Sequence, residues 1–220
     1  MQSAIIVFPG TNRERDAAKA LRRATGKDPH IVWHGDRELP KVDLILLPGG
    51  FSYGDYLRTG AMAAHSPIMR EVIDRANQGV HVWGICNGFQ ILCESQLLPG
   101  ILLRNKQLKF VCRAVTLQVE NTDSNYTKLC QAKQAMRVIV AHGDGNYFAE
   151  PDTLKSIEDN GQVAFRYVDN PNGSIHDIAG IFNKKRNVLG MMPHPEDAVE
   201  ALHGSMDGAV LFDSITKALS

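Results

Sequence analysis

The chain has 220 residues, 44% hydrophobic and 22% charged, which is the composition of a globular protein with a buried core. Lysine and arginine together number 24, as do aspartate and glutamate, so no broad field favours nucleic acid or an anionic membrane surface as a partner. The apolar runs have the length of strands and argue against a membrane-spanning helix. The length suits one domain, and we expect residues 1–220 to form it.

Predicted elements alternate between short apolar runs and amphipathic segments in the first half of the chain. In chain order they are strand 4–8, helix 14–24, strand 31–33, strand 44–47, helix 67–77, strand 80–85 and helix 87–96. Asn12 and Ser66 are expected to cap the first two helices, and Gly26 to end the first. Strands that are apolar throughout indicate a parallel sheet covered by helices on both faces.

The second half of the chain has a different pattern. Segment 109–120 alternates apolar and polar residues, as a half-exposed strand does. Further strands are predicted at 137–141, 162–168, 178–182 and 188–192, followed by a helix at about 207–219. The fold class is therefore α/β, with a mainly parallel sheet, helices on both faces and an antiparallel edge extension.

The cysteines and the first residues indicate a reducing compartment. No Cys-x-x-Cys spacing links the four cysteines, so we expect reduced thiols, no disulfide framework and no metal site. Residues 1–8 lack the basic start and cleavage site of a signal peptide and are typical of a strand. We expect a cytoplasmic protein. The cysteines are Cys86, Cys93, Cys112 and Cys130.

Cys86 is the most informative residue, because it lies between Gly84 and Gly88 at a predicted strand-to-helix turn. A residue at such a turn is held in a strained, exposed conformation, and small neighbours relieve the crowding around it. The first N–H groups of the following helix favour a thiolate there. A buried structural cysteine is the alternative interpretation of this motif alone.

Two other strand ends carry groups that a cysteine nucleophile needs. Ligands bind at the carboxyl ends of parallel strands, and His194 follows the strand at 188–192. His194 is a candidate base, and Glu196, two residues on in an extended segment, is placed to orient it. An oxyanion formed by attack on a carbonyl needs N–H donors, which Asn87 and the loop at 49–51 are positioned to supply.

Motifs over nearly the whole chain resemble those of the class I (triad) glutamine amidotransferases. They are FPGTN (8–12), LPGGFSYGDYLR (47–58), GICNGFQ (84–90), FVCR (110–113), AHGDG (141–145) and MPHPE (192–196). The resemblance implies that Cys86 attacks the side-chain amide of L-glutamine and forms a γ-glutamyl thioester. His194 would then move the proton and Glu196 would orient the imidazole.

The resemblance also assigns the residues around the thioester. Gly50 and Asn87 would form the oxyanion hole through their backbone N–H groups. The residues expected to bind or border the glutamine are Gly49, Phe51, Gln90, Arg113, His142 and Gly143.

A glutaminase on its own would only waste glutamine, so the resemblance implies partner proteins. The chain has no phosphate-binding loop motif, and we expect it to bind no cofactor itself. A large synthase subunit, with a small bridging subunit, would use ATP and Mg²⁺. Neither nucleic acid nor a membrane is expected as a partner.

Two alternative functions stay open at this point. The first is a stand-alone cysteine hydrolase or chaperone-like protein, although these commonly place histidine where this chain has Asn87. The second is a binding module with an inactive site, against which the intact Cys86, His194 and Glu196 argue.

Four further features have simple structural interpretations. Residues 13–16 are predicted to be an exposed first helical turn with ion pairs, and 184–186 a solvated turn. Trp33 and Trp83 are expected in the core. Asp197 departs from many relatives and adds negative charge beside the predicted triad.

Overall fold

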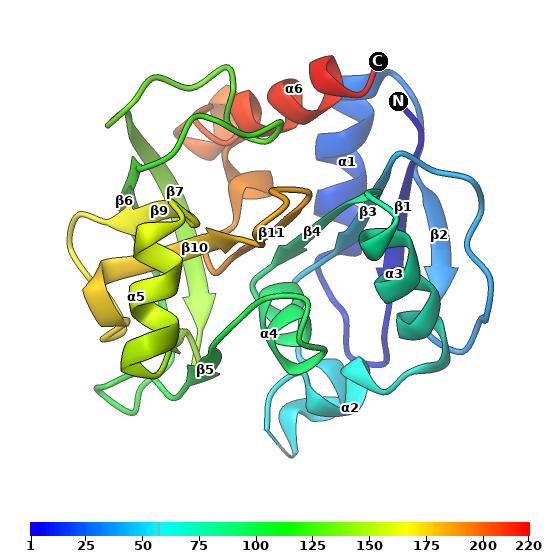
Figure 1. Ribbon diagram of the computed structural model, residues 1–220. Helices are drawn as coiled ribbons and strands as arrows, with labels where there is room; N and C mark the ends of the chain where they lie inside the picture. Colours follow the sequence, from blue (N-terminus) through cyan, green and yellow to red (C-terminus); the bar gives the residue numbers. More distant parts are fainter. Residues whose placement is uncertain (57) are drawn as a thin grey trace.

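A nine-stranded sheet runs through the molecule in the order β2-β1-β3-β4-β11-β10-β9-β6-β7 (Figure 1). This computed structural model describes residues 1–56 and 58–220, so Leu57 of the 47–58 motif lies outside the described residues. The strands are β1 (Ser3–Val7), β2 (His30–Trp33), β3 (Leu44–Leu47), β4 (His81–Ile85), β5 (Ile101–Leu103), β6 (Val111–Val119), β7 (Ala135–His142), β8 (Asn146–Phe148), β9 (Val163–Tyr167), β10 (Ile178–Phe182) and β11 (Val188–Met191).

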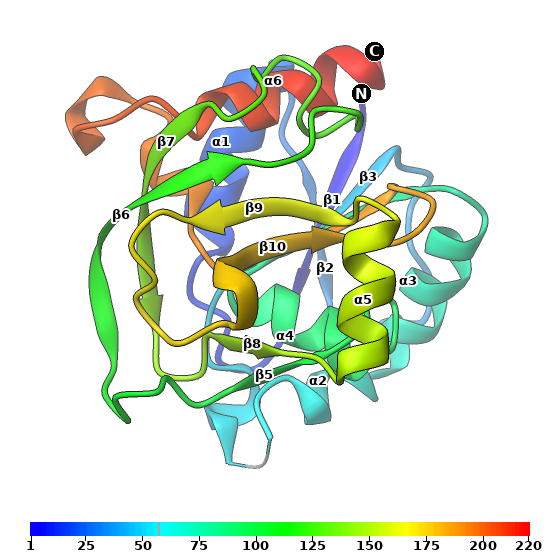
Figure 2. The same ribbon diagram turned by 60° about the vertical axis from the view of Figure 1, so that its left-hand side comes forward.

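The helices connect and cover these strands. The α-helices are α1 (Glu14–Thr25), α2 (Ala61–Ala64), α3 (Pro67–Asn77), α4 (Asn87–Glu94), α5 (Pro151–Asp159) and α6 (Ala209–Ala218). Short 3₁₀ turns are η1 (Ser52–Asp55), η2 (Ile175–Asp177), η3 (Pro195–Ala198) and η4 (Ala201–His203). In Figures 1 and 2, α1 and α6 lie side by side on one face of the parallel strands, and α3 and α4 lie on the other.

The sheet has the mixed topology that the sequence predicts. Strands β2, β1, β3, β4 and β11 pair in parallel. Strands β10, β9, β6 and β7 then continue the sheet by antiparallel pairing. The predicted fold class is confirmed, and the carboxyl ends of β3, β4 and β11 become neighbours at one edge.

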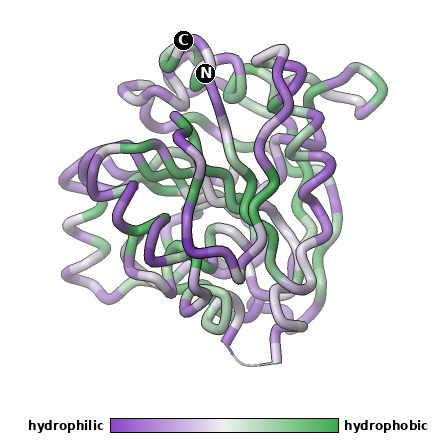
Figure 3. The backbone as a smooth tube through the Cα atoms, turned by 90° about the vertical axis from the view of Figure 1, so that its right-hand side faces the viewer, coloured by the Kyte–Doolittle hydropathy of each residue, from purple (hydrophilic) through white to green (hydrophobic). Residues whose placement is uncertain are grey.

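The core follows from the apolar strands. Every residue of β3 and β11 is buried, and Figure 3 shows hydrophobic residues concentrated along the central strands. Trp83 is fully buried against Tyr126 and Phe212, as predicted. Trp33 is 48% exposed, so its predicted place in the core is wrong: β2 is an edge strand, and Trp33 shares its open face with the exposed Ile31, while Val32 points to the core.

Several local predictions need correction. Helix α1 begins without a side-chain cap from Asn12, whereas Gly26 ends it in the left-handed conformation, as predicted, at φ 70°. Helix α5 and the β5–β8 pair were not predicted. Residues 184–186 do form a turn between β10 and β11. No helix within residues 1–56 and 58–220 is long and apolar enough to cross a membrane.

Candidate active site

Cys86 occupies a strained turn between β4 and α4. Its backbone has φ 52° and ψ −109°, a conformation that costs a non-glycine residue energy. The Cys86 N–H donates to the Met191 carbonyl at 2.8 Å, which fixes the turn to the end of β11. A Cβ on Gly88 would lie 1.9 Å from the Leu47 carbonyl oxygen, so only glycine lets α4 pack this close to β3. The strained turn is as the sequence predicts, but the expected exposure is wrong, because Cys86 is buried and only 6% exposed.

His194 and Glu196 form a buried pair at the end of β11. The imidazole Nδ1 donates to Glu196 Oε1 at 2.7 Å, and each residue is only 2% exposed. The sequence predicts this contact from an extended segment, whereas Glu196 lies in η3, which begins at Pro195, and its carboxylate meets the Nδ1 edge of the ring. The His194 N–H donates to the Ile139 carbonyl at 2.8 Å, which holds the backbone on β7.

The electrostatics of the pair favour a charged imidazole. Burial opposes the imidazolium, but the Glu196 carboxylate and the Cys86 sulfur outweigh it and hold the pKa of His194 well above its ordinary value. The other ring nitrogen, Nε2, is buried and has no hydrogen-bond partner among the described residues. That nitrogen is therefore the one left for proton transfer.

The side chains of Cys86 and His194 both lie next to Gly49. A Cβ added to Gly49 would lie 2.7 Å from His194 Cε1 and 3.5 Å from Cys86 Cβ. The same Cβ would lie 3.1 Å from Arg13 Cγ. The cysteine and the imidazole therefore lie around one glycine, which has no side chain to separate them.

Two backbone N–H groups near Cys86 are free to bind an anion. Asn87 is the first residue of α4, so its N–H has no intrahelical partner. In the loop after β3, the Phe51 N–H donates to the Gly10 carbonyl at 3.0 Å. Across the described part of the chain, neither Asn87 nor Gly50 uses its backbone N–H in a hydrogen bond. These two groups are the candidates for an oxyanion hole.

A cavity of about 150 Å³ opens onto Cys86. Phe51 and Phe110 form its outer wall, with ring centroids 6.3 Å apart and exposed fractions of 45% and 53%. Phe51 was predicted here, but Phe110 was singled out only as part of the FVCR motif. The lining residues are Asn12, Arg13, Gly50, Phe51, Cys86, Phe110, Ala141 and His194.

Gln90 and His142 lie near this cavity but are engaged by other protein groups. Gln90 Nε2 donates to the Asp144 carbonyl at 2.7 Å, and its Oε1 accepts from Asn87 at 2.8 Å. His142 Nδ1 lies 3.0 Å from Asn105 Oδ1. Burial, with the nearby His194, lowers the pKa of His142 to about 4, so this ring is neutral. Gln90 therefore ties segment 141–145 to α4, and His142 ties it to Asn105.

The structure places Gly143 near the cavity at Cys86 and Arg113 in a different hollow. Gly143 lies beside the aromatic wall, since a Cβ there would be 3.8 Å from Phe110 Cδ2. Arg113 lines a separate shallow hollow with Arg137 and Asp169 rather than the cavity at Cys86. Cys112, not Arg113, is in register with Ala141, and successive side chains of a strand point to opposite faces. Arg113 is not among the residues that line the cavity at Cys86, and its predicted role toward the substrate stays a prediction.

Arg13 belongs to the site, contrary to the predicted exposed turn. Its guanidinium forms an ion pair with Asp197, and its Nε lies 3.9 Å from Glu196 Oε1 and 3.3 Å from Asp16 Oδ2. Burial and the Glu196 charge raise the pKa of Asp197, while Arg13 opposes that rise. In the sequence, the second acid directly after Glu196 is a signal that a cation is needed.

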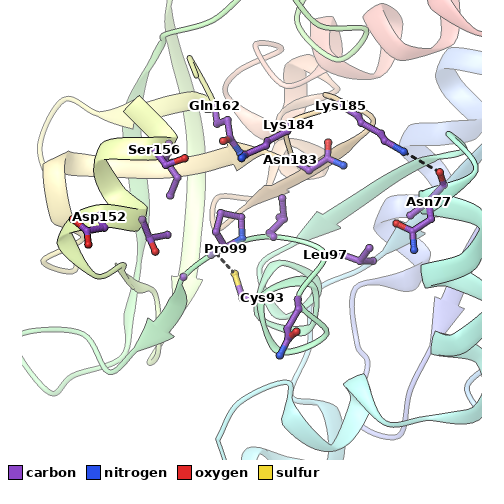
Figure 4. Close-up of a pocket in the computed structure, with 16 residues that line it drawn as sticks. Asn77, Cys93, Leu97, Pro99, Asp152, Ser156, Gln162, Asn183, Lys184 and Lys185 are labelled. Atoms are coloured by element: carbon purple, nitrogen blue, oxygen red, sulfur yellow. Dashed lines mark hydrogen bonds between the residues drawn. The ribbon is translucent and has the colours of Figure 1, made fainter. Parts of the chain in front are cut away.

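A larger cavity, of about 680 Å³, lies away from Cys86 between α4, α5 and the end of α3 (Figure 4). Its lining includes Cys93, Asp152 and Lys185, and none of the predicted site residues. Within the described ranges, no group of three or more His, Cys, Asp or Glu residues could hold a metal ion.

The sheet, the cysteine elbow and the buried His194–Glu196 pair define the class of protein. Residues 1–209 match the family described as the CobB/CobQ-like glutamine amidotransferase domain, and the chain belongs to that family. The expected membership among the glutamine amidotransferases is confirmed.

Two relatives are similar to this chain over nearly their whole length. The chain is 56% identical over 216 residues to the phosphoribosylformylglycinamidine synthase subunit PurQ of Rhizobium johnstonii, with 97% of each chain covered. It is 58% identical over 217 residues to the subunit of that name from Chelativorans sp., with 98% of each covered.

Solved structures agree with these relatives. The structure of PurLQS from Thermotoga maritima matches with a TM-score of 0.92 and 45% identity, covering 100% of this chain and 99% of the other. A glutamine amidotransferase from the same organism, at a TM-score of 0.56 and 15% identity, shares the fold; the match covers 100% of this chain and 94% of the other.

Proposed function

We propose that this chain hydrolyses L-glutamine through Cys86 and supplies the ammonia to a synthase that converts formylglycinamide ribonucleotide to formylglycinamidine ribonucleotide with ATP, in de novo purine biosynthesis. One observation carries the proposal: the buried His194–Glu196 pair meets a strained cysteine around Gly49. The two relatives named as synthase subunits, matched over 97% or more of their length, support this choice of acceptor.

The reaction begins with attack of the Cys86 sulfur on the carboxamide carbon of glutamine. The carbonyl oxygen becomes an oxyanion, and the N–H groups of Gly50 and Asn87 donate to it. His194 delivers a proton to the amide nitrogen, the carbon–nitrogen bond breaks, and ammonia leaves a γ-glutamyl thioester. Glu196 keeps the imidazole in the orientation that this transfer needs.

Water completes the cycle by attacking the thioester. His194 accepts the proton of the attacking water, the carbon–sulfur bond breaks, and glutamate leaves with the sulfur restored. The balance is glutamine and water in, glutamate and ammonia out.

The walls of the cavity have proposed roles toward the substrate. Gly49 and Phe51 would border the reacting amide, with Phe110 opposite. Gln90, His142 and Gly143 would shape the inner wall by holding the 141–145 loop in place, because the polar atoms of Gln90 and His142 already bond to protein groups.

The proposed partner is a large synthase subunit, with a small bridging subunit completing the complex. The names of the two relatives, each a synthase subunit, support this view, as does the structural neighbour titled PurLQS. In this scheme residues 1–220 act as one amidotransferase domain in the cytoplasm, and ATP and Mg²⁺ bind the large subunit.

Labelling and variant assays test the proposal together. A γ-glutamyl electrophile should modify Cys86 and spare Cys112, the exposed cysteine of β6. In the assembled complex, Cys86→Ala should abolish glutamine-dependent synthesis and leave ammonia-dependent synthesis intact, while Cys112→Ala changes neither. Loss of both activities in Cys86→Ala would make Cys86 structural. Absence of labelling, even with partners present, would favour a binding module.

A further inference from the structure

Among the described residues, three cations of α1 and the loop before it pair with acids in the C-terminal part of the chain. Lys19 Nζ lies 2.9 Å from Glu200, and Arg23 Nη1 lies 2.9 Å from Asp213, in both cases between partly exposed side chains. Pairs of this kind contribute little to stability. The third pair, Arg13 with Asp197, differs because Arg13 also reaches a fully buried carboxylate.

We propose that Arg13 is a positioning residue that acts through its charge: it attracts the Glu196 carboxylate at 3.9 Å without a hydrogen bond and cancels the charge of Asp197, so that His194 faces one net negative charge from these two acids instead of two. The inference rests on the proposed glutaminase function. Arg13 would act through Glu196 and Asp197, without forming a bond to the reacting atoms.

The geometry supports this role in two ways. Glu196 Oε1, which accepts the His194 Nδ1–H, is the same oxygen that lies 3.9 Å from Arg13 Nε. The Arg13 backbone N–H donates to the Gly49 carbonyl at 3.3 Å. One residue therefore links the carboxylate that orients the base to the loop that carries the Gly50 donor.

The charges around His194 show why such a residue is needed. Glu196 contacts the ring, Asp197 follows it in η3, and Cys86 lies across from the imidazole. His142 faces it from β7 as a neutral ring. Asp16, from α1, also contacts Arg13, but its side chain is 46% exposed and solvent screens its charge. Arg13 is the cation that offsets the buried Glu196 and the partly buried Asp197.

A charge cycle in the complete synthase complex tests the inference. The variants are Arg13→Gln, Asp197→Asn, the double variant, and Lys19→Gln as the matched control, which loses an α1 ion pair away from the triad. Because removing a cation raises every nearby pKa, Arg13→Gln should move both limbs of the pH profile of glutaminase kcat/KM upward by about one pH unit. Asp197→Asn should move them downward, and the double variant should return close to the parent.

Two further measurements separate positioning from folding and from substrate binding. Arg13→Gln should lower kcat at neutral pH by about tenfold with little change in KM, and Lys19→Gln should leave the pH profile unchanged. Melting curves identify variants that fail to fold; if Arg13→Gln is one, the downward shift in Asp197→Asn still tests the charge balance. An unshifted profile in Arg13→Gln, an equal shift in Lys19→Gln, or an effect confined to KM would overturn the inference.

Titration of the His194 ring by NMR keeps this inference separate from the proposed function. The ring pKa in the isolated chain should move in the same directions across the four variants. A parent complex without glutaminase activity, but with those ring shifts, would refute the function and keep the charge balance. Active complexes in which the His194 ring pKa does not move would support the proposed function and refute the charge balance.

Discussion

Substitution of Gly49 tests whether the site depends on contact around a single backbone position. A methyl group there would lie 2.7 Å from His194 Cε1, whereas carbon atoms in favourable contact are about 3.5–4.0 Å apart. The imidazole must therefore retreat by about 1 Å, and the Arg13 Cγ, at 3.1 Å, limits how the new group can turn. Overpacking of this kind costs about 1–3 kcal/mol of folding free energy.

The catalytic effect of Gly49→Ala should exceed its effect on stability. A displacement of about 1 Å of a reacting group lowers the rate by about 10²-fold, so glutaminase kcat/KM of the complex should fall by that factor. The melting temperature should fall by about 2–4 °C for each kcal/mol lost. Gly35→Ala is the matched control, because Gly35 lies outside the site and its new methyl group would be an ordinary 3.4 Å from the exposed Trp33 side chain. Full activity in Gly49→Ala would refute the reasoning that His194 and Cys86 meet there.

Three further substitutions probe the triad, the elbow and the half-buried Asp55. Glu196→Gln should lower kcat by about 10²–10⁴-fold with KM little changed, because the amide no longer stabilises the imidazolium. Steady-state kinetics that show less than a tenfold loss of kcat would contradict this expectation. Cys86→Gly should unfold at a higher denaturant concentration than Cys86→Ala, since glycine tolerates φ 52°, and equal midpoints would show that the elbow is unstrained. Burial, and then the charge of Asp144, raises the pKa of Asp55 to about 6. The folded chain therefore binds the Asp55 proton more tightly than the unfolded chain does. The folded chain loses stability as the pH rises through 6. Asp55→Asn should therefore add ~1 kcal/mol of unfolding free energy at pH 8, a value reduced for solvent screening, and progressively less towards pH 4; urea titrations with an equal gain at both would exclude the mechanism.

Most strands of the sheet are predictable from the sequence, because the burial of each strand sets its pattern of apolar and polar residues. Strands β3 and β4 are covered on both faces and read as continuous apolar runs, while β6 alternates because one face is partly open. The β5–β8 pair has three residues in each strand, too few for a periodic pattern to emerge. Trp33 is apolar like the core residues, and its exposure follows from the tertiary structure, which leaves the Ile31–Trp33 face of the edge strand β2 open.

In the candidate site, the contacts between residues close in sequence are predictable, and those between distant residues are not. The elbow at Cys86 and the His194–Glu196 pair each lie within a few residues, so motif and spacing were enough to predict their contacts. Arg13 meets Asp197 across 184 positions of sequence, and four charged residues in a row at 13–16 are more often an exposed turn. A second acid beside a catalytic carboxylate nonetheless requires compensation once both are half-buried or more, because an unpaired charge there is costly. Asp197 is therefore the residue from which a cation could have been inferred, although the packing of α1 against η3 decides that Arg13 supplies it.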